Sequence, residues 1–368
     1  MNKFLYFTVA FVALILFSCS QESDPVNEVL TGKQANVSLN LLSKGAKDTK
    51  ATTETVSHSD DEKINNYIAF FFTDAGALVS KHYVADPAAV GANSLPTITV
   101  ASKVYVIANT GALEGGLFAD VVSERQLKAV AGSLSNQSEA PFTTSTQTGK
   151  NVWMEGQAAV EFDGNQGTAS VELAFLAAKI EVVVIDKRKN NDDPSRIQIT
   201  NTDIVLINAG SQAKFFATEA DKMKQDFYFN GDLSYRHHDN QAEAAFLSEK
   251  YAEKGVYFYA FGNSSEEQPT ILAIKAQRVE NNGRPRTVYY PVAFSSLDAG
   301  ASNRLYADFI PGNYYKVTIT LTEDVAGEDV SGGGGSTDNP EKPVVNGALS
   351  VSIVTATWEV KTVEKVFS

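Results

Sequence analysis

The stretch that organises this chain lies close to its C-terminal end and reads Ala348-Leu349-Ser350-Val351-Ser352-Ile353-Val354. Leu349, Val351 and Ile353 alternate with serines and a valine. Because successive side chains of a β-strand point to opposite faces, this alternation predicts a strand with one apolar face. Such a strand needs a sheet on which to bury that face, and either its own domain or another molecule can supply one.

The segments on both sides of this strand extend the pattern. The preceding residues, Ser331–Pro340, include four consecutive glycines, which predict a flexible linker. Beyond the strand, the apolar positions shift to Trp358 and Val360, so a bulge or bend is expected after Val354. We therefore expect residues 331–368 to form a glycine linker followed by C-terminal strands that the linker tethers flexibly to the rest of the chain.

The first residues indicate export. A basic start is followed by an uncharged run, Phe4–Phe17, which is shorter than the ~20 residues needed to span a bilayer. Residues 1–18 are therefore predicted to be a signal peptide. Leu16-Phe17-Ser18-Cys19 is similar to a bacterial lipobox, so we expect a lipid on Cys19. Cys19 is also the only cysteine, which leaves no intramolecular disulfide to stabilise the fold.

A second strand pattern follows at Val37-Ser38-Leu39-Asn40-Leu41. Its apolar residues Val37, Leu39 and Leu41 have nearly the same spacing as those of the C-terminal strand. We assign this strand to a lipidated propeptide, residues 19–44.

Three lysines come directly after that strand in a stretch of small and polar residues. They are Lys44, Lys47 and Lys50. An exposed, extended segment with basic residues is a substrate for a trypsin-like protease. The alternative is a solvated loop whose lysines have no role.

Composition and charge exclude one class of partner. The 368 residues carry a formal net charge of −13 at pH 7, so no positive field is available to neutralise phosphates. We expect no nucleic-acid partner. The length is consistent with about two domains after removal of the signal peptide.

Most of the remaining chain reads as short strands separated by turns, with a single helix expected at Asp120–Ala131. One long strand is expected at Ala169–Ile185, and another at Lys214–Thr218. The polar stretch Asp186–Pro194 marks a composition break, so we predict β-sandwich domains at residues 45–186 and 187–330. The predicted fold class is all-β.

Catalytic and metal-binding patterns are missing from the sequence. The four histidines form no metal-ligand spacing; they are His58, His82, His237 and His238. No nucleophile motif or paired carboxylate stands out. We therefore expect no enzyme activity and no cofactor.

Several short motifs, in their order along the chain, resemble the fimbrillins, the pilin subunits of Bacteroidales type V pili. They are the lipobox, Lys103–Asn109, Trp153–Gly156, Ala178–Ile180, Pro311–Val317 and the tail around Trp358. The resemblance implies two transthyretin-like β-sandwich domains and export as an outer-membrane lipoprotein. It also implies that an Arg- or Lys-specific protease removes the lipid and the first strand, after which a C-terminal strand of the next subunit fills the vacated groove.

The sequence departs from this family pattern at the cleavage site. Many relatives are cut after arginine, but the first arginine here is Arg125, inside the folded part. A lysine must serve instead, and Lys44 is favoured over Lys47 and Lys50. The spare C-terminal strand predicts a shaft subunit with other copies, tip subunits and anchor subunits as partners, in a surface fimbrium that supports adhesion and biofilm formation.

The alternative is a glycan-binding surface lipoprotein that keeps its lipid on Cys19. Exposed aromatic side chains would then stack on sugar rings, although aromatic residues at strand spacing more often pack in a core. The candidates are Trp153, Tyr228, Tyr235, Tyr257 and Tyr259. Processing separates the two functions, because a pilin of this kind loses everything before Gly45.

Overall fold

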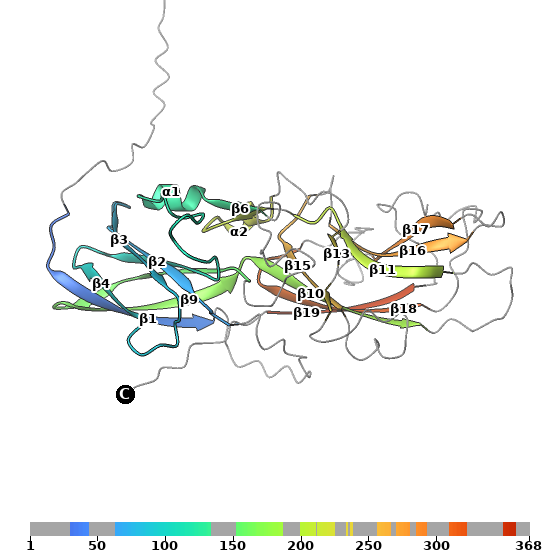
Figure 1. Ribbon diagram of the computed structural model, residues 1–368, viewed down its shortest axis with the longest axis horizontal. Helices are drawn as coiled ribbons and strands as arrows, with labels where there is room; N and C mark the ends of the chain where they lie inside the picture. The colour runs from blue at the N-terminus through green and yellow to red at the C-terminus, as the bar shows by residue number, and fades with distance from the viewer. Residues whose placement is uncertain are drawn as a thin grey trace, which may run out of the picture.

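The computed structural model describes the chain over a series of separate ranges. These are residues 30–43, 63–133, 152–186, 199–210, 212–224, 233–234, 236–237, 256–265, 270–279, 285–292, 309–321 and 349–357. Strands dominate these residues, which confirms the prediction of an all-β fold. The molecule is elongated, with one group of strands at each end (Figure 1).

The N-terminal half is built on one eight-stranded sheet. Its strands, in spatial order, are β3 (Leu78–Val84), β2 (Tyr67–Phe72), β5 (Lys103–Ala108), β7 (Met154–Ala159), β9 (Gln166–Phe175), β1 (Gln34–Ser43) and β4 (Ser94–Ile98), with β8 (Glu161–Asp163) also paired to β9. The long strand β9 pairs with β1 from Gln166 to Leu173 and with β8 over its first three residues, whereas β7 pairs with it only at Ala174 and Phe175. The core-facing residues of β1, β2 and β5 belong to one hydrophobic core, so the sheet folds over on itself at β9.

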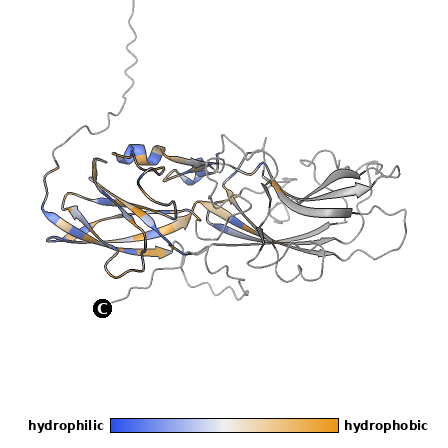
Figure 2. Cartoon of the chain, viewed as in Figure 1, coloured by the Kyte–Doolittle hydropathy of each residue, from blue (hydrophilic) through white to orange (hydrophobic). Residues whose placement is uncertain are grey.

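Strand β2 lies at the centre of this core. All six of its residues are buried, which requires cover on both faces of the sheet. The Phe118 ring packs against Phe70 of β2 with centroids 6.2 Å apart, and Leu127 of the helix α1 (Glu124–Ala129) belongs to the same core. Hydrophobic residues accordingly run along the strands of this half, while α1 carries hydrophilic residues as well (Figure 2).

The helix α1 is shorter than the segment expected from the sequence. Ser123 caps its N-terminus, and the Ser123 side chain accepts a hydrogen bond from the Gln126 N–H at 3.2 Å. Residues before Ser123 are held in turns instead, because the Lys81 ammonium donates to the carbonyls of Ala119 and Val121. The Ser123 cap and the partly buried Lys81 therefore set the boundary that hydrophobic periodicity alone placed too early.

The C-terminal half contains two larger sheets that form two layers (Figure 1). The five-stranded sheet has the order β14 (Arg236–His237), β15 (Val256–Phe261), β10 (Ala177–Asp186), β18 (Asn313–Leu321) and β19 (Leu349–Thr357). The four-stranded sheet has the order β13 (Leu233–Ser234), β11 (Ile199–Ile207), β16 (Ile271–Val279) and β17 (Pro285–Val292).

The long strand expected at Ala169–Ile185 is two strands, β9 and β10, which belong to different halves. The break lies at Leu176, whose N–H donates to the Trp153 carbonyl at 3.0 Å instead of continuing a ladder. Strand β10 then pairs with β15 and β18. The chain thus passes from the N-terminal sheet to a C-terminal sheet at Leu176, one whole strand before the polar stretch that follows Asp186.

A seam of aromatic side chains joins the two halves. Trp153 stacks on Phe261 with centroids 5.9 Å apart and packs against Phe215 at 5.6 Å. The short strands β6 (Ala131–Ser133) and β12 (Gln212–Lys214) pair beside this cluster. A Cβ on Gly132 would lie 2.3 Å from the Trp153 ring, so only glycine leaves room for the indole.

The strand expected at Lys214–Thr218 is not formed, because β12 ends at Lys214 and the short helix α2 (Glu219–Lys222) begins after Thr218. The Thr218 side chain caps α2 by accepting a hydrogen bond from the Asp221 N–H at 3.1 Å. The segment between them bends to pack Phe215 into the seam.

Candidate functional site

Strand β1 occupies a groove between β9 and β4. It runs parallel to β9, from Asn36 beside Gln166 to Ser43 beside Leu173. It runs antiparallel to β4 over its first five residues, from Gln34 beside Ile98 to Ser38 beside Ser94. The first strand of the chain is therefore an inner strand of the sheet, although both of its neighbours come from later in the sequence.

The apolar face of β1 fills the core under this groove. Val37, Leu39 and Leu41 are 0%, 5% and 3% exposed, whereas Asn36 and Ser38 on the other face are exposed. The strand and its apolar face are as the alternation predicts. Burying each of these three side chains contributes about 1.5–3 kcal/mol to the free energy of folding. Strand β1 therefore contributes a large part of the stability of the N-terminal half.

Backbone and side-chain hydrogen bonds complete the groove. The Leu39 N–H donates to the Asn93 carbonyl at 2.8 Å, and the Asn36 N–H donates to the Asn165 carbonyl at 3.1 Å. The Tyr67 hydroxyl donates to the Asn93 side-chain oxygen at 2.8 Å, and burial raises the pKa of Tyr67. The phenol therefore stays protonated and holds the loop before β4 against β1.

The lysine segment begins where β1 ends. Lys44, Lys47 and Lys50 lie outside the described residues, and so does Cys19. The nearest lysines on either side of this segment, Lys33 and Lys63, are bound to the fold through backbone hydrogen bonds. Lys33, just before β1, accepts a hydrogen bond from the Thr99 N–H at 3.0 Å through its carbonyl.

Lys63, on the far side of the lysine segment, is also tied to the fold. Its carbonyl accepts a hydrogen bond from the buried Asn109 side chain at 2.8 Å. The same amide donates to the Val152 carbonyl at 2.9 Å and accepts from the Asn65 N–H at 2.8 Å. Asn109 has a positive φ of 66°, which asparagine tolerates better than most residues. The start of β2 is thus anchored independently of β1.

The C-terminal strand belongs to a different sheet from the one that contains this groove. Strand β19, which carries Leu349, Val351 and Ile353, pairs antiparallel with β18 alone among the described strands. Pairing continues without a shift from Leu349 to Thr357, so any bulge lies beyond this point. Trp358 and Val360 lie outside the described residues. The structure therefore does not bring the tail and the β1 groove together within one chain.

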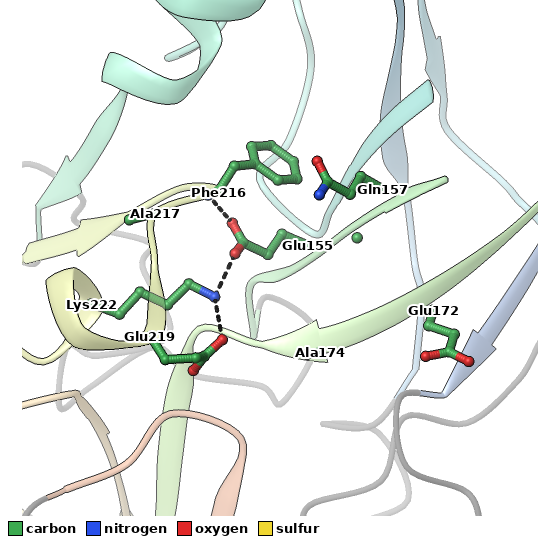
Figure 3. Close-up of a pocket in the computed structure, with 9 residues that line it drawn as sticks. Glu155, Gln157, Glu172, Ala174, Phe216, Ala217, Glu219 and Lys222 are labelled. Carbon is green, nitrogen blue, oxygen red and sulfur yellow. Dashed lines mark hydrogen bonds and ion pairs between the residues drawn. The ribbon is translucent and has the colours of Figure 1, made fainter. Parts of the chain in front are cut away.

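A pocket of about 280 Å³ lies where β7 and β9 meet the α2 segment (Figure 3). The Glu155 carboxylate is 2.8 Å from the Lys222 ammonium and accepts a hydrogen bond from the Phe216 N–H at 2.6 Å. Glu219 lies 3.3 Å from the same ammonium. Burial raises the pKa of Glu155, and attraction to Lys222 offsets part of that rise. These charges are bonded to one another, so the cluster joins the two halves instead of presenting charge to a ligand.

The aromatic residues considered for sugar stacking are poorly placed where the structure describes them. Trp153 and Tyr259 are both 2% exposed and lie in the core and the seam. Tyr257 lies in β15, while Tyr228 and Tyr235 lie outside the described residues. Two of the five candidates therefore cannot contact a sugar.

The histidines do not gather into a site in the described part of the chain. His82 lies on β3 and His237 on β14, while His58 and His238 lie outside the described residues. Burial lowers the pKa of His82. Within the described ranges, His, Cys, Asp and Glu form no cluster of three or more that suits a metal ion. The helices in these ranges are also too short or too polar to cross a membrane.

The walls of the groove were not identified from the sequence. The alternation Gly167-Thr168-Ala169-Ser170-Val171 indicates a half-buried strand, and β9 is one. Its pairing with β1, more than a hundred residues earlier in the chain, has no local signal. Strand β4 carries Pro96 and pairs with only part of β1, so its contribution could not be predicted either.

Two sequence families match consecutive parts of the chain. The FimA major fimbrial subunit protein family matches residues 35–192, and the C-terminal domain of FimA-like major fimbrial subunit proteins matches residues 177–358. Their matches overlap over β10, the strand that changes sheet. Among curated proteins, no sequence matches the chain.

Solved structures cover nearly all of the chain. A candidate cell adhesion protein from Bacteroides eggerthii is 35% identical with a TM-score of 0.68, over 90% of this chain and 98% of that one. A fimbrilin from Porphyromonas gingivalis is 18% identical with a TM-score of 0.56, over 89% of this chain and 98% of that one. A candidate cell adhesion protein from Parabacteroides distasonis is 14% identical with a TM-score of 0.53, over 89% and 97%. The last two share the fold with this chain.

Proposed function

Because the chain belongs to the family of FimA-like major fimbrial subunits, we propose that it is a shaft subunit of a type V fimbria. In this proposal it is exported as a lipoprotein, cut by a protease and polymerised by strand exchange. Family membership implies a structural, non-enzymatic role in adhesion at the cell surface, together with other fimbrial subunits. The proposal adds how the subunits are matured and joined.

The observation that carries the proposal is the position of β1. It is an inner strand with a fully buried apolar face, and it ends next to the lysine segment. A cut after Lys44 would leave β1 joined to the rest of the subunit only by non-covalent contacts. Its departure would expose the edges of β9 and β4, which another strand can complete by β-augmentation.

Two features disfavour cleavage at Lys33 and Lys63, the lysines on either side of the proposed segment. The Lys33 backbone is bonded to Thr99, and the Lys63 carbonyl is bonded to Asn109, which makes both lysines poor substrates because a protease needs an extended, unpaired backbone. We propose Lys44 as the main site, with Lys47 and Lys50 as alternatives. The downstream sheet keeps its anchor at Asn109 after the cut.

The proposed donor is the tail of a neighbouring subunit. Among the described strands, β19 pairs with β18 alone, so its release breaks fewer of the described ladders than the release of an inner strand. The glycine linker before it supplies the reach. In the uncut chain, covalent attachment gives β1 a high effective concentration in the groove, which keeps the subunit monomeric.

Before maturation, a lipid on Cys19 holds the precursor in the outer membrane. The proposed protease is trypsin-like and specific for Lys or Arg. The two halves are proposed to be transthyretin-like β-sandwiches, and assembly with tip and anchor subunits is proposed to support adhesion and biofilm formation.

Processing at the lysine segment provides the test. The combined change Lys44→Ala, Lys47→Ala and Lys50→Ala should leave folded, lipid-bearing monomers on the cell surface, while wild-type polymers should begin at Gly45, Asp48 or Ala51. Mass spectrometry of the N-terminus reads both results, and Lys33→Ala is the matched control that should mature normally. Polymers of the triple variant that still carry a lipid on Cys19 would refute the processing model.

A further inference from the structure

The wall of the groove formed by β9 is graded in size. Its four buried residues that face the core beside β1 become larger along the strand; they are Gly167, Ala169, Val171 and Leu173. The β1 residues beside the first three, in the same order, are Val37, Leu39 and Leu41. The space available to a strand in the groove is therefore greatest at Gly167 and decreases toward Leu173.

Gly167 forms a notch that two neighbouring side chains already fill. A Cβ at this position would lie 2.7 Å from the Val37 Cγ2 atom and 2.8 Å from the Phe162 Cε1 atom. Val37 comes from β1 on one side, and Phe162 comes from β8 on the other. The β-branched Val37 side chain has few alternative rotamers, so a methyl group at 167 would push the strand in the groove out of place.

The sequence of the tail suits this graded wall in one register. A strand that slips by one residue turns its apolar face to solvent, so only shifts of two residues compete. In the register that β1 uses, the side-by-side pairs are Leu349 with Gly167, Val351 with Ala169 and Ile353 with Val171. In this register, a branched apolar side chain of the tail fills the space beside each of these three β9 residues.

Shifts by two residues fit worse in either direction. In one direction Gly347 would lie beside Gly167, which leaves the notch empty. In the other direction Thr355 would lie beside Val171, which buries a hydroxyl group in an apolar wall. The notch and the wall together therefore distinguish registers that alternation alone cannot.

We propose that Gly167 sets the register in which two copies of this chain join, by receiving Leu349 of the second copy in the notch that Val37 fills before cleavage. This inference rests on the proposed function, because it requires the tail of one subunit to replace β1 of another. It adds the residue that selects the register and the side chain that the residue selects.

Disulfide formation across the exposed face of β9 measures the register directly. In the uncut chain, the Asn40 side chain donates to the Ser170 hydroxyl at 3.5 Å, so these two positions are neighbours. In the proposed register Ser352 takes the place of Asn40. Neighbouring strand positions meet the distance that a disulfide needs.

The experiment mixes two variants of the full chain after cleavage by a lysine-specific protease. One copy carries Ser170→Cys, and the other carries Ser352→Cys, Ser350→Cys or Val354→Cys. We expect a disulfide between copies only with the Ser352 variant. The combination of Asn40→Cys and Ser170→Cys in the uncut chain is the positive control for folding and for access to oxidant.

Two failures remain distinguishable. A disulfide that forms with the Ser350 or Val354 variant in place of the Ser352 variant would overturn the register while leaving strand exchange intact. The absence of a disulfide with all three variants, when the positive control forms, would overturn strand exchange by this tail and the register with it.

The role of Gly167 itself is tested in the same assay. Gly167→Ala should reduce the yield of the disulfide between the Ser170→Cys copy and the Ser352→Cys copy by about tenfold, because the added methyl group overpacks the notch. Shortening the incoming side chain with Leu349→Ala should restore the yield. Thr168→Ala, on the exposed face of the same strand, is the matched control. An unchanged yield with Gly167→Ala would show that the glycine does not select the register.

Discussion

Glu124 shows how single side chains hold the cover of the N-terminal core in place. Its carboxylate accepts a hydrogen bond from the Tyr105 hydroxyl at 2.6 Å and lies 2.6 Å from the Lys128 ammonium and 3.0 Å from the Lys103 ammonium. Tyr105 and Lys103 belong to β5, and Glu124 begins α1. The cluster therefore fastens the helix to the sheet.

This cluster predicts a dependence of stability on pH. Partial burial alone would raise the pKa of Glu124, but hydrogen bonds from Lys128, Tyr105 and Lys103 outweigh it and lower the pKa from 4.5 to about 2. Because the pKa is lowered in the folded state, the stabilisation is complete above about pH 4.5 and is lost as the pH falls toward 2.

Glu124→Gln should therefore reduce the free energy of unfolding by about 1 kcal/mol at pH 7, since solvent screens part of the cluster. The difference from wild type should shrink as the pH falls below 4.5. Urea unfolding at pH 7 and pH 3 measures both values. A difference that is the same at the two pH values would contradict the assignment of this stabilisation to the ionised carboxylate.

At the scale of elements, α2 and β7 are joined by the buried Glu155–Lys222 pair. The two side chains are 6% and 11% exposed, so neither is well solvated. Removing one partner of a buried pair leaves an uncompensated charge, which is more costly than the loss of a surface pair. The pair should therefore contribute strongly to the contact between the two halves.

We expect Lys222→Met to destabilise the protein by about 3 kcal/mol, with partial recovery when Glu155→Gln is added. Lys224→Met removes the exposed pair with Asp221 nearby and should leave the unfolding midpoint almost unchanged. Thermal unfolding of these three variants and of wild type provides the measurement. Equal effects of Lys222→Met and Lys224→Met would show that the buried pair adds nothing to the seam.

The elements also show which parts of the structure the sequence could predict. Alternation located β1 and β19, because one strand face must be buried. The division of Ala169–Ile185 into β9 and β10 could not be predicted, since apolar residues continue through the break at Leu176. The break depends on a backbone contact with Trp153 that has no signature in the local sequence.

The candidate site could likewise be predicted only in part from the sequence. The matching patterns of Val37, Leu39 and Leu41 and of Leu349, Val351 and Ile353 indicate two strands suited to similar surroundings. The groove itself could not be predicted, because its walls are β9 and β4, whose pairing with β1 is set by the overall fold. The notch at Gly167 is a property of that pairing, and a glycine in a strand does not show in the sequence which neighbour will fill it.

At the scale of the whole molecule, strands from opposite ends of the chain are proposed to serve one role. The first strand completes the N-terminal sheet within the uncut subunit, and the last described strand pairs at the edge of a C-terminal sheet. In the proposed strand exchange, the proteolytic cut frees the groove, and the tail of one copy leaves its place beside β18 to occupy the groove of another copy. The aromatic seam would then join, within each subunit, the half that accepts a tail to the half that donates one.

Size-exclusion chromatography after lysine-specific cleavage tests this central claim most directly. Ile353→Asp places a carboxylate on the apolar face of the tail, whereas Ser352→Asp places the same charge on the opposite face. We predict that wild type and Ser352→Asp form ladders of subunits, while Ile353→Asp and a chain ending at Val330 are cut at lysine and remain single subunits. Ladders of equal length from Ile353→Asp and from wild type would contradict strand donation by this tail.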